Sequence, residues 1–216
     1  EYQNIAISYA GRLDPLAHGV LLLVTGDALR EKEALLELPK TYEFEALLGV
    51  STDTYDCLGL PMQNFIQPPI NVNTIVNSFA KQHIGKQIQS YPPFSSKTVQ
   101  GKPLFVWAKE GKLSEIEIIK QGVSESSRNN ACAKLAGYYF SKRIFENIAL
   151  VKGDFRQETI NHAWKKFFEI TMEKTFTTVK FKIRCSSGTY VRGIVNDLGQ
   201  TLGCGAIAIE IFRTAV

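Results

Sequence analysis

Residues 178–199 read TVKFKIRCSSGTYVRGIVNDLG, and they contain the clearest strand and the clearest helix signal of the chain. The first eight residues alternate apolar and mainly basic side chains, which predicts a strand with one buried face. A Ser-Ser-Gly turn follows, and residues 189–199 then carry apolar side chains at helical spacing. Strands and helices are mixed along the chain without a strand–helix–strand rhythm, which predicts an α+β fold with a mainly antiparallel sheet.

Arg192 falls at the start of this expected helix, where the helix dipole disfavours a cation by about 0.3–1 kcal/mol. Two interpretations stay open. The side chain either extends into water, or it faces a carboxylate or phosphate, with which arginine forms planar bidentate pairs. Asp14 is the carboxylate on the most suggestive loop, but spacing along the chain does not establish that the two side chains meet.

Asp14 lies in the stretch 8–27, SYAGRLDPLAHGVLLLVTGD, between a tight turn and an apolar run. The run 20–24 is far shorter than the roughly 20 apolar residues that span a bilayer, and we expect it to be a buried strand. Asp followed by Pro also favours a helix start, with Asp14 as the N-cap. The local sequence therefore fits a capping role and also an acid presented for chemistry on a loop.

The rest of the chain alternates between clear elements and uninformative segments. In the expected strand 40–49, Tyr42 and Phe44 lie on one face, and Glu43 and Glu45 on the other. The other expectations are helices over 27–38, 72–84 and 155–168, strands over 115–119 and 206–212, and loops over 51–59 and 124–130.

Residues 85–112 combine lysines with aromatic side chains. Five lysines occur there against one acid, Glu110, and Tyr, Phe and Trp residues lie between them. Basic residues interleaved with aromatics suit a surface that follows a nucleic-acid backbone and stacks on bases. A solvated loop whose aromatic side chains pack inward is an equally good interpretation.

Composition is that of an ordinary globular protein, with 216 residues, 44% hydrophobic and 21% charged. The net charge of +4 is compatible with a nucleic-acid partner but is only weak support for one. The four cysteines and three histidines are scattered, so we expect no zinc site and no disulfide framework. Reduced thiols and a cytoplasmic location follow as expectations, and no membrane segment or secretory signal is expected.

Four stretches resemble, in the right order, motifs of the bacterial tRNA pseudouridine synthase B family: GRLDPLAHGVLLLVTGDA, TYEFEALLGVSTDTYDCLG, YPPFSSKTVQGKPLFVWAKEGK and RCSSGTYVRGIVNDLGQTLGCGA. The GRLD motif alone would also fit synthases that act on ribosomal RNA, whereas the other motifs point to the tRNA branch. The resemblance implies the pseudouridine synthase fold, a mixed sheet flanked by helices. It also implies a single catalytic domain over residues 1–216, with an RNA-gripping insertion at about 85–112.

The activity that this resemblance implies is isomerisation of uridine to pseudouridine at position 55, in the T loop of tRNA. The family uses no cofactor and no metal, and we expect a monomer. Two alternatives stay open: a tRNA-binding or tRNA-folding chaperone of the same fold with weak catalysis, and a synthase acting on ribosomal RNA.

Residue roles follow from the same resemblance. Asp14 falls on the catalytic aspartate, Tyr42 on the tyrosine that stacks against the target base, and Arg192 on the arginine that pairs with the aspartate. Tyr190 falls on a tyrosine that lines the pocket. The lysines of the insertion, among which we single out Lys97 and Lys102, fall on the part that grips the T loop.

Three features depart from the family pattern. Tyr9 stands where the family usually has a histidine at the RNA contact, and Ile211 where it has a pocket leucine, a swap that conserves volume. The N-terminal Lys-Pro motif and the C-terminal RNA-binding domain of the family are not expected in this chain.

Overall fold

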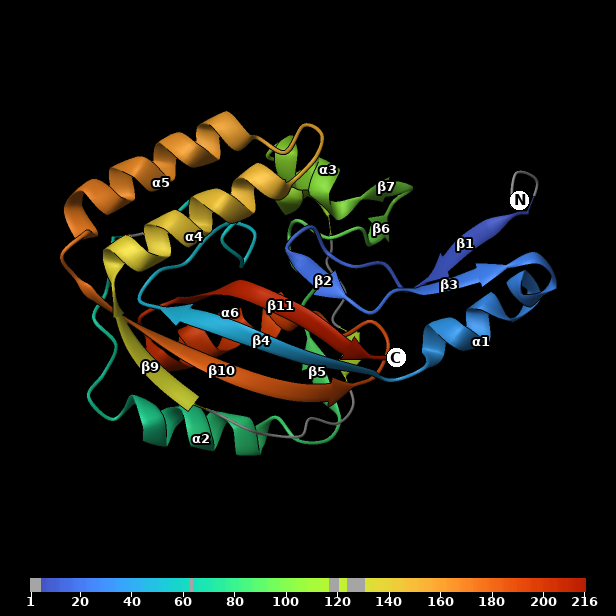
Figure 1. Cartoon of the computed structure of the whole chain (residues 1–216), viewed down its shortest axis with the longest axis horizontal. Helices are drawn as coiled ribbons and strands as arrows, with labels where there is room; N and C mark the ends of the chain where they lie inside the picture. Colours follow the sequence, from blue (N-terminus) through green and yellow to red (C-terminus); the bar gives the residue numbers. More distant parts are fainter. Residues whose placement is uncertain (1–4, 63, 117–120, 124–130) are drawn as a thin grey trace.

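The computed structural model describes residues 5–62, 64–116, 121–123 and 131–216 (Figure 1). Its strands are β1 (Ile7–Ala10), β2 (Ala17–Gly19), β3 (Leu22–Thr25), β4 (Lys40–Leu48), β5 (Gln87–Gln89), β6 (Thr98–Val99), β7 (Lys102–Pro103), β8 (Gln121–Val123), β9 (Ala131–Ala136), β10 (Thr175–Cys185) and β11 (Ala206–Ala215). Its helices are α1 (Lys32–Glu37), α2 (Val72–Gln82), α3 (Leu104–Lys109), α4 (Gly137–Leu150), α5 (Gln157–Thr171) and α6 (Val191–Leu202), with 3-10 helices η1 (Gly26–Glu31) and η2 (Leu113–Glu115).

A five-stranded sheet in the order β2-β11-β4-β10-β9 forms the centre of the fold. Strands β4, β9, β10 and β11 pair antiparallel, and only β2 runs parallel to its neighbour β11. The expected α+β class with a mainly antiparallel sheet is therefore confirmed. The register places Tyr42 opposite Arg213 and Phe44 opposite Ile211, which brings the N-terminal half of β4 next to the C-terminal half of β11.

Strand β4 is buried on both faces from Phe44 to Leu48, whereas Glu43 stays exposed. Its alternation buries Phe44 as predicted, but Glu45 is also buried, with only 4% of its surface exposed. The reason is Arg143 of α4, whose guanidinium binds Glu45 at 2.7 Å and Glu210 of β11 at 2.6 Å. A buried carboxylate is tolerated when an opposite charge pairs with it, so the face that carries Glu43 and Glu45 is exposed at Glu43 but buried at Glu45.

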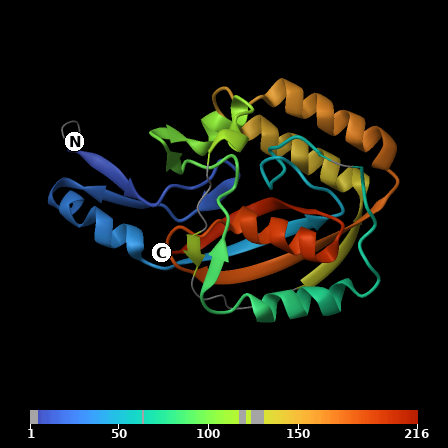
Figure 2. The same cartoon turned by 180° about the vertical axis from the view of Figure 1, so that it is seen from behind.

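Helix α6 lies across one face of this sheet, as Figure 2 shows from behind, and it packs against β11. Helices α4 and α5 run side by side along the sheet (Figure 1). The buried core between these layers contains Trp164, Phe167 and Phe168 of α5. Helix α4 had no clear signal in the sequence.

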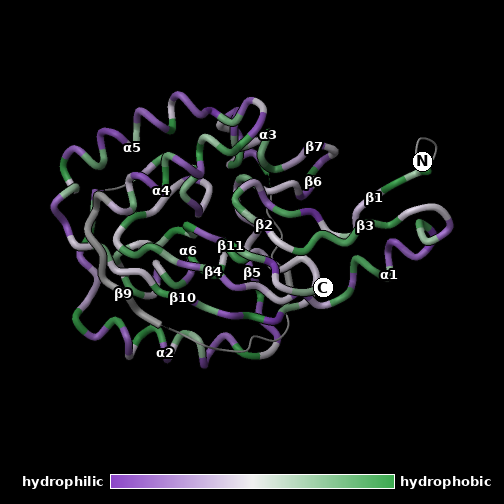
Figure 3. The backbone as a smooth tube through the Cα atoms, in the orientation of Figure 1, coloured by the Kyte–Doolittle hydropathy of each residue, from purple (hydrophilic) through white to green (hydrophobic). Residues whose placement is uncertain are grey.

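Strands β1 and β3 form a separate two-stranded sheet that projects from the main body with α1 (Figure 1). Only Val24 of the apolar run 20–24 is buried, whereas Leu23 is 59% exposed. The expectation of a buried strand there is wrong, because β3 pairs with β1 alone. The stretch stays apolar in the hydropathy view, although it lies at the surface (Figure 3).

The remaining expectations fall into three groups. Helices α2 and α5 and strand β11 confirm the predictions over 72–84, 155–168 and 206–212, and residues 51–59 form a loop. The helix expected over 27–38 is divided into η1 and α1. Residues 117–119 of the expected strand and the expected loop 124–130 lie outside the described residues. No helix in the described ranges is long and apolar enough to cross a membrane.

Candidate active site

Asp14 lies on the loop between β1 and β2, at the edge of the main sheet. Its carbonyl oxygen accepts a hydrogen bond from the N–H of Ala17 at 2.8 Å, which closes a single turn that leads into β2. The helix that Asp14 and Pro15 were expected to start is not formed. The capping prediction is therefore wrong, and the Asp14 carboxylate, with its side chain 30% exposed, is available for other contacts.

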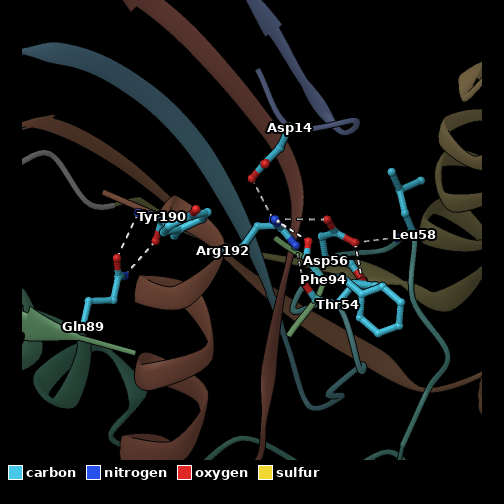
Figure 4. Close-up of polar contacts among 8 residues, drawn as sticks. All are labelled: Asp14, Thr54, Asp56, Leu58, Gln89, Phe94, Tyr190 and Arg192. Atoms are coloured by element: carbon cyan, nitrogen blue, oxygen red, sulfur yellow. Dashed lines mark hydrogen bonds and ion pairs between the residues drawn. The ribbon is translucent and has the colours of Figure 1, made fainter. Parts of the chain in front are cut away.

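Arg192 connects this loop to three other parts of the chain (Figure 4). It is the second residue of α6 and is only 2% exposed. Its Nε donates a hydrogen bond to Oδ2 of Asp14 at 2.8 Å. Its two terminal nitrogens donate to the carbonyl oxygens of Thr54 and Phe94, at 2.7 and 3.2 Å. The cation that the helix dipole disfavours is thus held by a carboxylate and two carbonyl groups, which settles the open question about Arg192.

Asp56 is a second carboxylate beside Arg192, and no role was expected for it. Its Oδ2 lies 3.6 Å from Arg192 Nε, while its Oδ1 accepts hydrogen bonds from the Thr54 hydroxyl at 2.6 Å and the Leu58 N–H at 2.9 Å (Figure 4). Burial raises the pKa of Asp56 to about 6, although Arg192 and the Thr54 hydroxyl oppose this rise. Asp14 and Asp56 therefore share one buried guanidinium.

These charges also act on the arginine. Burial alone would lower the pKa of Arg192, but the nearby charges of Asp14 and Asp56 more than offset this effect and raise it. The guanidinium is therefore positive at neutral pH, and its charge favours the ionised form of the buried Asp56 carboxylate. An ionised carboxylate with one partly exposed side is a suitable nucleophile.

A cavity of about 220 Å³ opens beside Asp14. Its walls come from the Asp14 loop, the start of β4, the loop before α6, and β11, and they include Tyr42, Tyr190 and Ile211. The structure thus brings four of the predicted site residues to one cavity, with Arg192 bonded to Asp14 behind it. The aromatic and apolar side chains among these walls suit contact with a flat ring such as a nucleobase.

Tyr42 stands on β4 directly opposite Arg213 of β11. Burial raises the pKa of Tyr42 above its usual value of about 10, although a hydrogen bond with Arg213 opposes the rise. A phenol with a raised pKa is a poor proton acceptor at neutral pH. The raised pKa therefore argues against Tyr42 as a base at neutral pH.

Segment 85–112 is attached to the cavity through main-chain groups. Gln89 of β5 donates a hydrogen bond to the carbonyl oxygen of Tyr190 at 2.8 Å and accepts one from its N–H at 2.9 Å (Figure 4). The carbonyl of Phe94 accepts from Arg192, and Ser96 lines the cavity. This segment thereby holds Tyr190, the residue before α6, and Arg192, the second residue of the helix.

The other predicted site residues lie outside the cavity lining. Tyr9 is 38% exposed, and its hydroxyl accepts a hydrogen bond from Arg12 at 2.8 Å. Lys97 is exposed and lies 5.1 Å from the centre of the Tyr91 ring. Lys102 forms an ion pair with Glu110 at 2.7 Å and lies 4.4 Å from the Trp107 ring. Part of the segment's positive charge is thus engaged internally.

Residues that sequence reasoning missed are Asp56, Gln89, Lys40 and Arg213, of which the last two also line the cavity. Lys40 shares a strand face with Tyr42, and Arg213 shares one with Ile211, so the alternation of β4 and β11 could have identified them. In the described part of the chain, no group of three or more His, Cys, Asp or Glu side chains could hold a metal ion.

Comparison with known proteins assigns the chain to a family. The family profile described as "TruB family pseudouridylate synthase (N terminal domain)" matches residues 2–142. The chain belongs to the TruB family. The matched range includes Asp14, Tyr42 and Asp56, whereas Arg192 lies beyond it.

Relatives of the TruB family match almost all of this chain. The tRNA pseudouridine synthase B of Blochmanniella pennsylvanica is 31% identical over 97% of this chain and 64% of its own length. That of Idiomarina loihiensis is 32% identical over 100% of this chain and 55% of its own length. Among solved structures, a chain in the crystal structure of a Cbf5-Nop10-Gar1 complex aligns over 97% of this chain and 40% of that chain, with a TM-score of 0.49 and 18% identity. The chain thus spans little more than half the length of the curated relatives it matches.

Proposed function

We propose that this chain converts uridine to pseudouridine in tRNA, with position 55 in the T loop as its target. The observation that carries the proposal is the Asp14–Arg192 pair, with its 2.8 Å hydrogen bond, at a cavity lined by Tyr42 and Tyr190. Membership of the TruB family and relatives named tRNA pseudouridine synthase B support the same reaction. The setting we expect for it is the cytoplasm, where tRNA is modified.

The reaction moves the uracil ring on its ribose. The bond between C1′ and N1 breaks, a bond between C1′ and C5 forms, N1 gains a proton and C5 loses one. Asp14 is the nucleophile in this proposal, attacking either the ribose carbon or the base. Arg192 orients the Asp14 carboxylate through its hydrogen bond, because its guanidinium is itself fixed by the carbonyl groups of Thr54 and Phe94.

The cavity would receive the uridine only after it has left the stacked RNA. Flipping a nucleotide costs a few kcal/mol, which stacking on an aromatic side chain helps to offset. Tyr42 takes this stacking role, and Tyr190 and Ile211 enclose the base. Residues 85–112 would act as an insertion of the single catalytic domain, with Lys97 and Lys102 following the RNA backbone and Tyr9 contacting RNA near the cavity.

Tritium release from tRNA labelled at uridine C5 tests this proposal, because formation of the C–C bond expels that hydrogen. We expect release from a tRNA transcript that carries uridine at position 55, and none from the same transcript with cytidine there. Release from both transcripts would contradict the assigned position. No release from either would contradict the activity and favour a tRNA-binding chaperone, and release only from a ribosomal RNA transcript would reassign the substrate.

A further inference from the structure

Two buried cations line the cavity on the side of Tyr42. Lys40, the first residue of β4, is 4% exposed, and Arg213 of β11 is 1% exposed. The two side chains converge on the loop that carries Asp14. A Cβ added to Gly11 would stand 3.4 Å from Cε of Lys40 and 3.5 Å from Nη1 of Arg213. Two positive charges thus meet at the base of the Asp14 loop.

Both cations donate hydrogen bonds to neutral main-chain carbonyl groups, those of Leu36 and Leu38 for Lys40 and those of Val20 and Gly11 for Arg213. No carboxylate among the described residues lies within ion-pair distance of either cation. A lysine has three N–H donors and an arginine has five, so each side chain keeps donor capacity beyond these bonds.

Buried charges in proteins are normally paired, because removing an unpaired charge from water is costly. Here the two cations also repel each other. Burial first, and then the charge of Arg213, lower the pKa of Lys40, and exposed Glu37 is the carboxylate that opposes this effect. The described residues supply no anion that pairs with both groups, and both groups line the cavity, where a bound ligand can supply one.

We propose that Lys40 and Arg213 bind a backbone phosphate of the RNA, in one of the two linkages next to the uridine held in the cavity. This inference rests on the proposed function. A phosphodiester supplies one negative charge and two free oxygens, which suit the forked donors of arginine and the ammonium of lysine. Ser186 and Ser187, in the loop after β10, also line the cavity. Anchoring that phosphate would fix the ribose relative to Asp14.

The test measures binding in the Asp14→Asn protein, so that turnover does not enter. Three T stem-loop oligonucleotides are compared: one with only phosphodiesters, one with a neutral methylphosphonate 5′ of the target uridine, and one with it 3′, all with the same 2′-deoxy sugars. We expect one of the two methylphosphonates to weaken binding about tenfold or more, since a hydrogen bond to a charged group contributes about that much. The position that is affected identifies the linkage.

Variants then assign the effect to the two cations. Adding Lys40→Met should reduce the methylphosphonate penalty to less than about twofold, whereas Lys40→Arg should retain it because the charge remains. Lys165→Met, which removes an exposed lysine on α5, should leave the penalty unchanged. A full penalty in the Lys40→Met protein would overturn the proposal. If that variant does not fold, Arg213→Gln provides the same comparison.

Binding of the three oligonucleotides by the Asp14→Asn protein also tests the phosphate site without further variants. Equal binding of all three by the Asp14→Asn protein would overturn the phosphate site without affecting the proposed function, which tritium release tests separately. Failure to bind any of the three would also overturn the phosphate site, and tritium release by the native protein would then decide the proposed function. A penalty with no tritium release from the native protein would support the phosphate site and contradict the isomerase activity.

Discussion

Replacing Arg192 with Met should destabilise the protein strongly, and the size of the effect should depend on pH. The substitution removes the partner of the buried Asp56 carboxylate and of the carbonyl groups of Thr54 and Phe94. Removing one member of a buried ion pair costs about 3–5 kcal/mol. The Asp14 side chain is 30% exposed, so water takes over part of its interaction and it adds little to this cost.

The pH dependence comes from Asp56. Its pKa is about 6 in the folded protein, above the value of about 3.9 in an unfolded chain. The stability linked to this raised pKa is fully present below about pH 4 and is lost as pH rises through about 6. Without Arg192, which lowers the pKa of Asp56, the carboxyl group should stay protonated at pH 7. In the native protein, ionisation of Asp56 stabilises the folded state by about 1.4 kcal/mol at pH 7, since its pKa lies one unit below that pH. The variant, in which Asp56 stays protonated, lacks this contribution.

We therefore expect Arg192→Met to lower the free energy of unfolding by about 3–5 kcal/mol at pH 7 and by about 1.4 kcal/mol less at pH 5. Urea unfolding at the two pH values measures both quantities, with Lys165→Met as a surface control that should stay within about 0.5 kcal/mol of the native protein. In an Asp56→Asn background, the loss of unfolding free energy caused by Arg192→Met should be the same at pH 7 and at pH 5. A loss below about 1 kcal/mol at pH 7, or an equal loss at both, would refute this account of the Arg192 network.

Three further predictions concern the cavity and the segment beside it. Tyr42→Phe should bind tRNA as tightly as the native protein. The rate of tritium release by the native protein should show no tyrosine ionisation up to pH 9, because burial raises the pKa of Tyr42. A release rate that rises with a pKa near 8 would contradict this. Lys97→Ala should weaken tRNA binding and reduce the slope of log affinity against log salt by about 0.7–0.9. Lys102→Ala should change this slope less, because Glu110 already neutralises Lys102. Equal slopes in both variants and the native protein would contradict the RNA-gripping role of segment 85–112. Gln89→Ala should lower the free energy of unfolding, measured by urea unfolding, by about 1–3 kcal/mol, since the Tyr190 N–H and carbonyl lose their partner. A change under about 0.5 kcal/mol would show that water replaces the Gln89 amide.

The periodicity of the sequence predicted those elements whose environment repeats along the chain. Strand β10 and helix α6 each bury one regular face, so the spacing of their apolar residues was informative. The run 20–24 was misassigned because apolar character does not reveal whether a second layer covers a strand. Glu45 was misassigned because its partner, Arg143, is 98 residues away. Tertiary contacts decided both cases.

The site could be predicted from the sequence only in part, for the same reason. Asp14 and Arg192 are 178 residues apart, and their pairing followed from the resemblance to a family, not from spacing. Asp56 lies in the quoted TDTYD motif, but nothing local distinguishes it from an acid in an ordinary turn. Lys40 and Arg213 were overlooked because charged residues at strand ends usually face water. Their alternation with buried neighbours was the available signal.

The role of Asp14 as nucleophile is the central claim, and a single-turnover experiment tests it most directly. Native protein and Asp14→Asn, each in excess over C5-tritiated tRNA, are compared after their affinities for that tRNA have been measured. We predict one tritium released per tRNA by the native protein and no release above the protein-free rate by Asp14→Asn, with affinities within about threefold, since about 0.6 kcal/mol separates such values. Release by Asp14→Asn at a rate near that of the native protein would contradict the account.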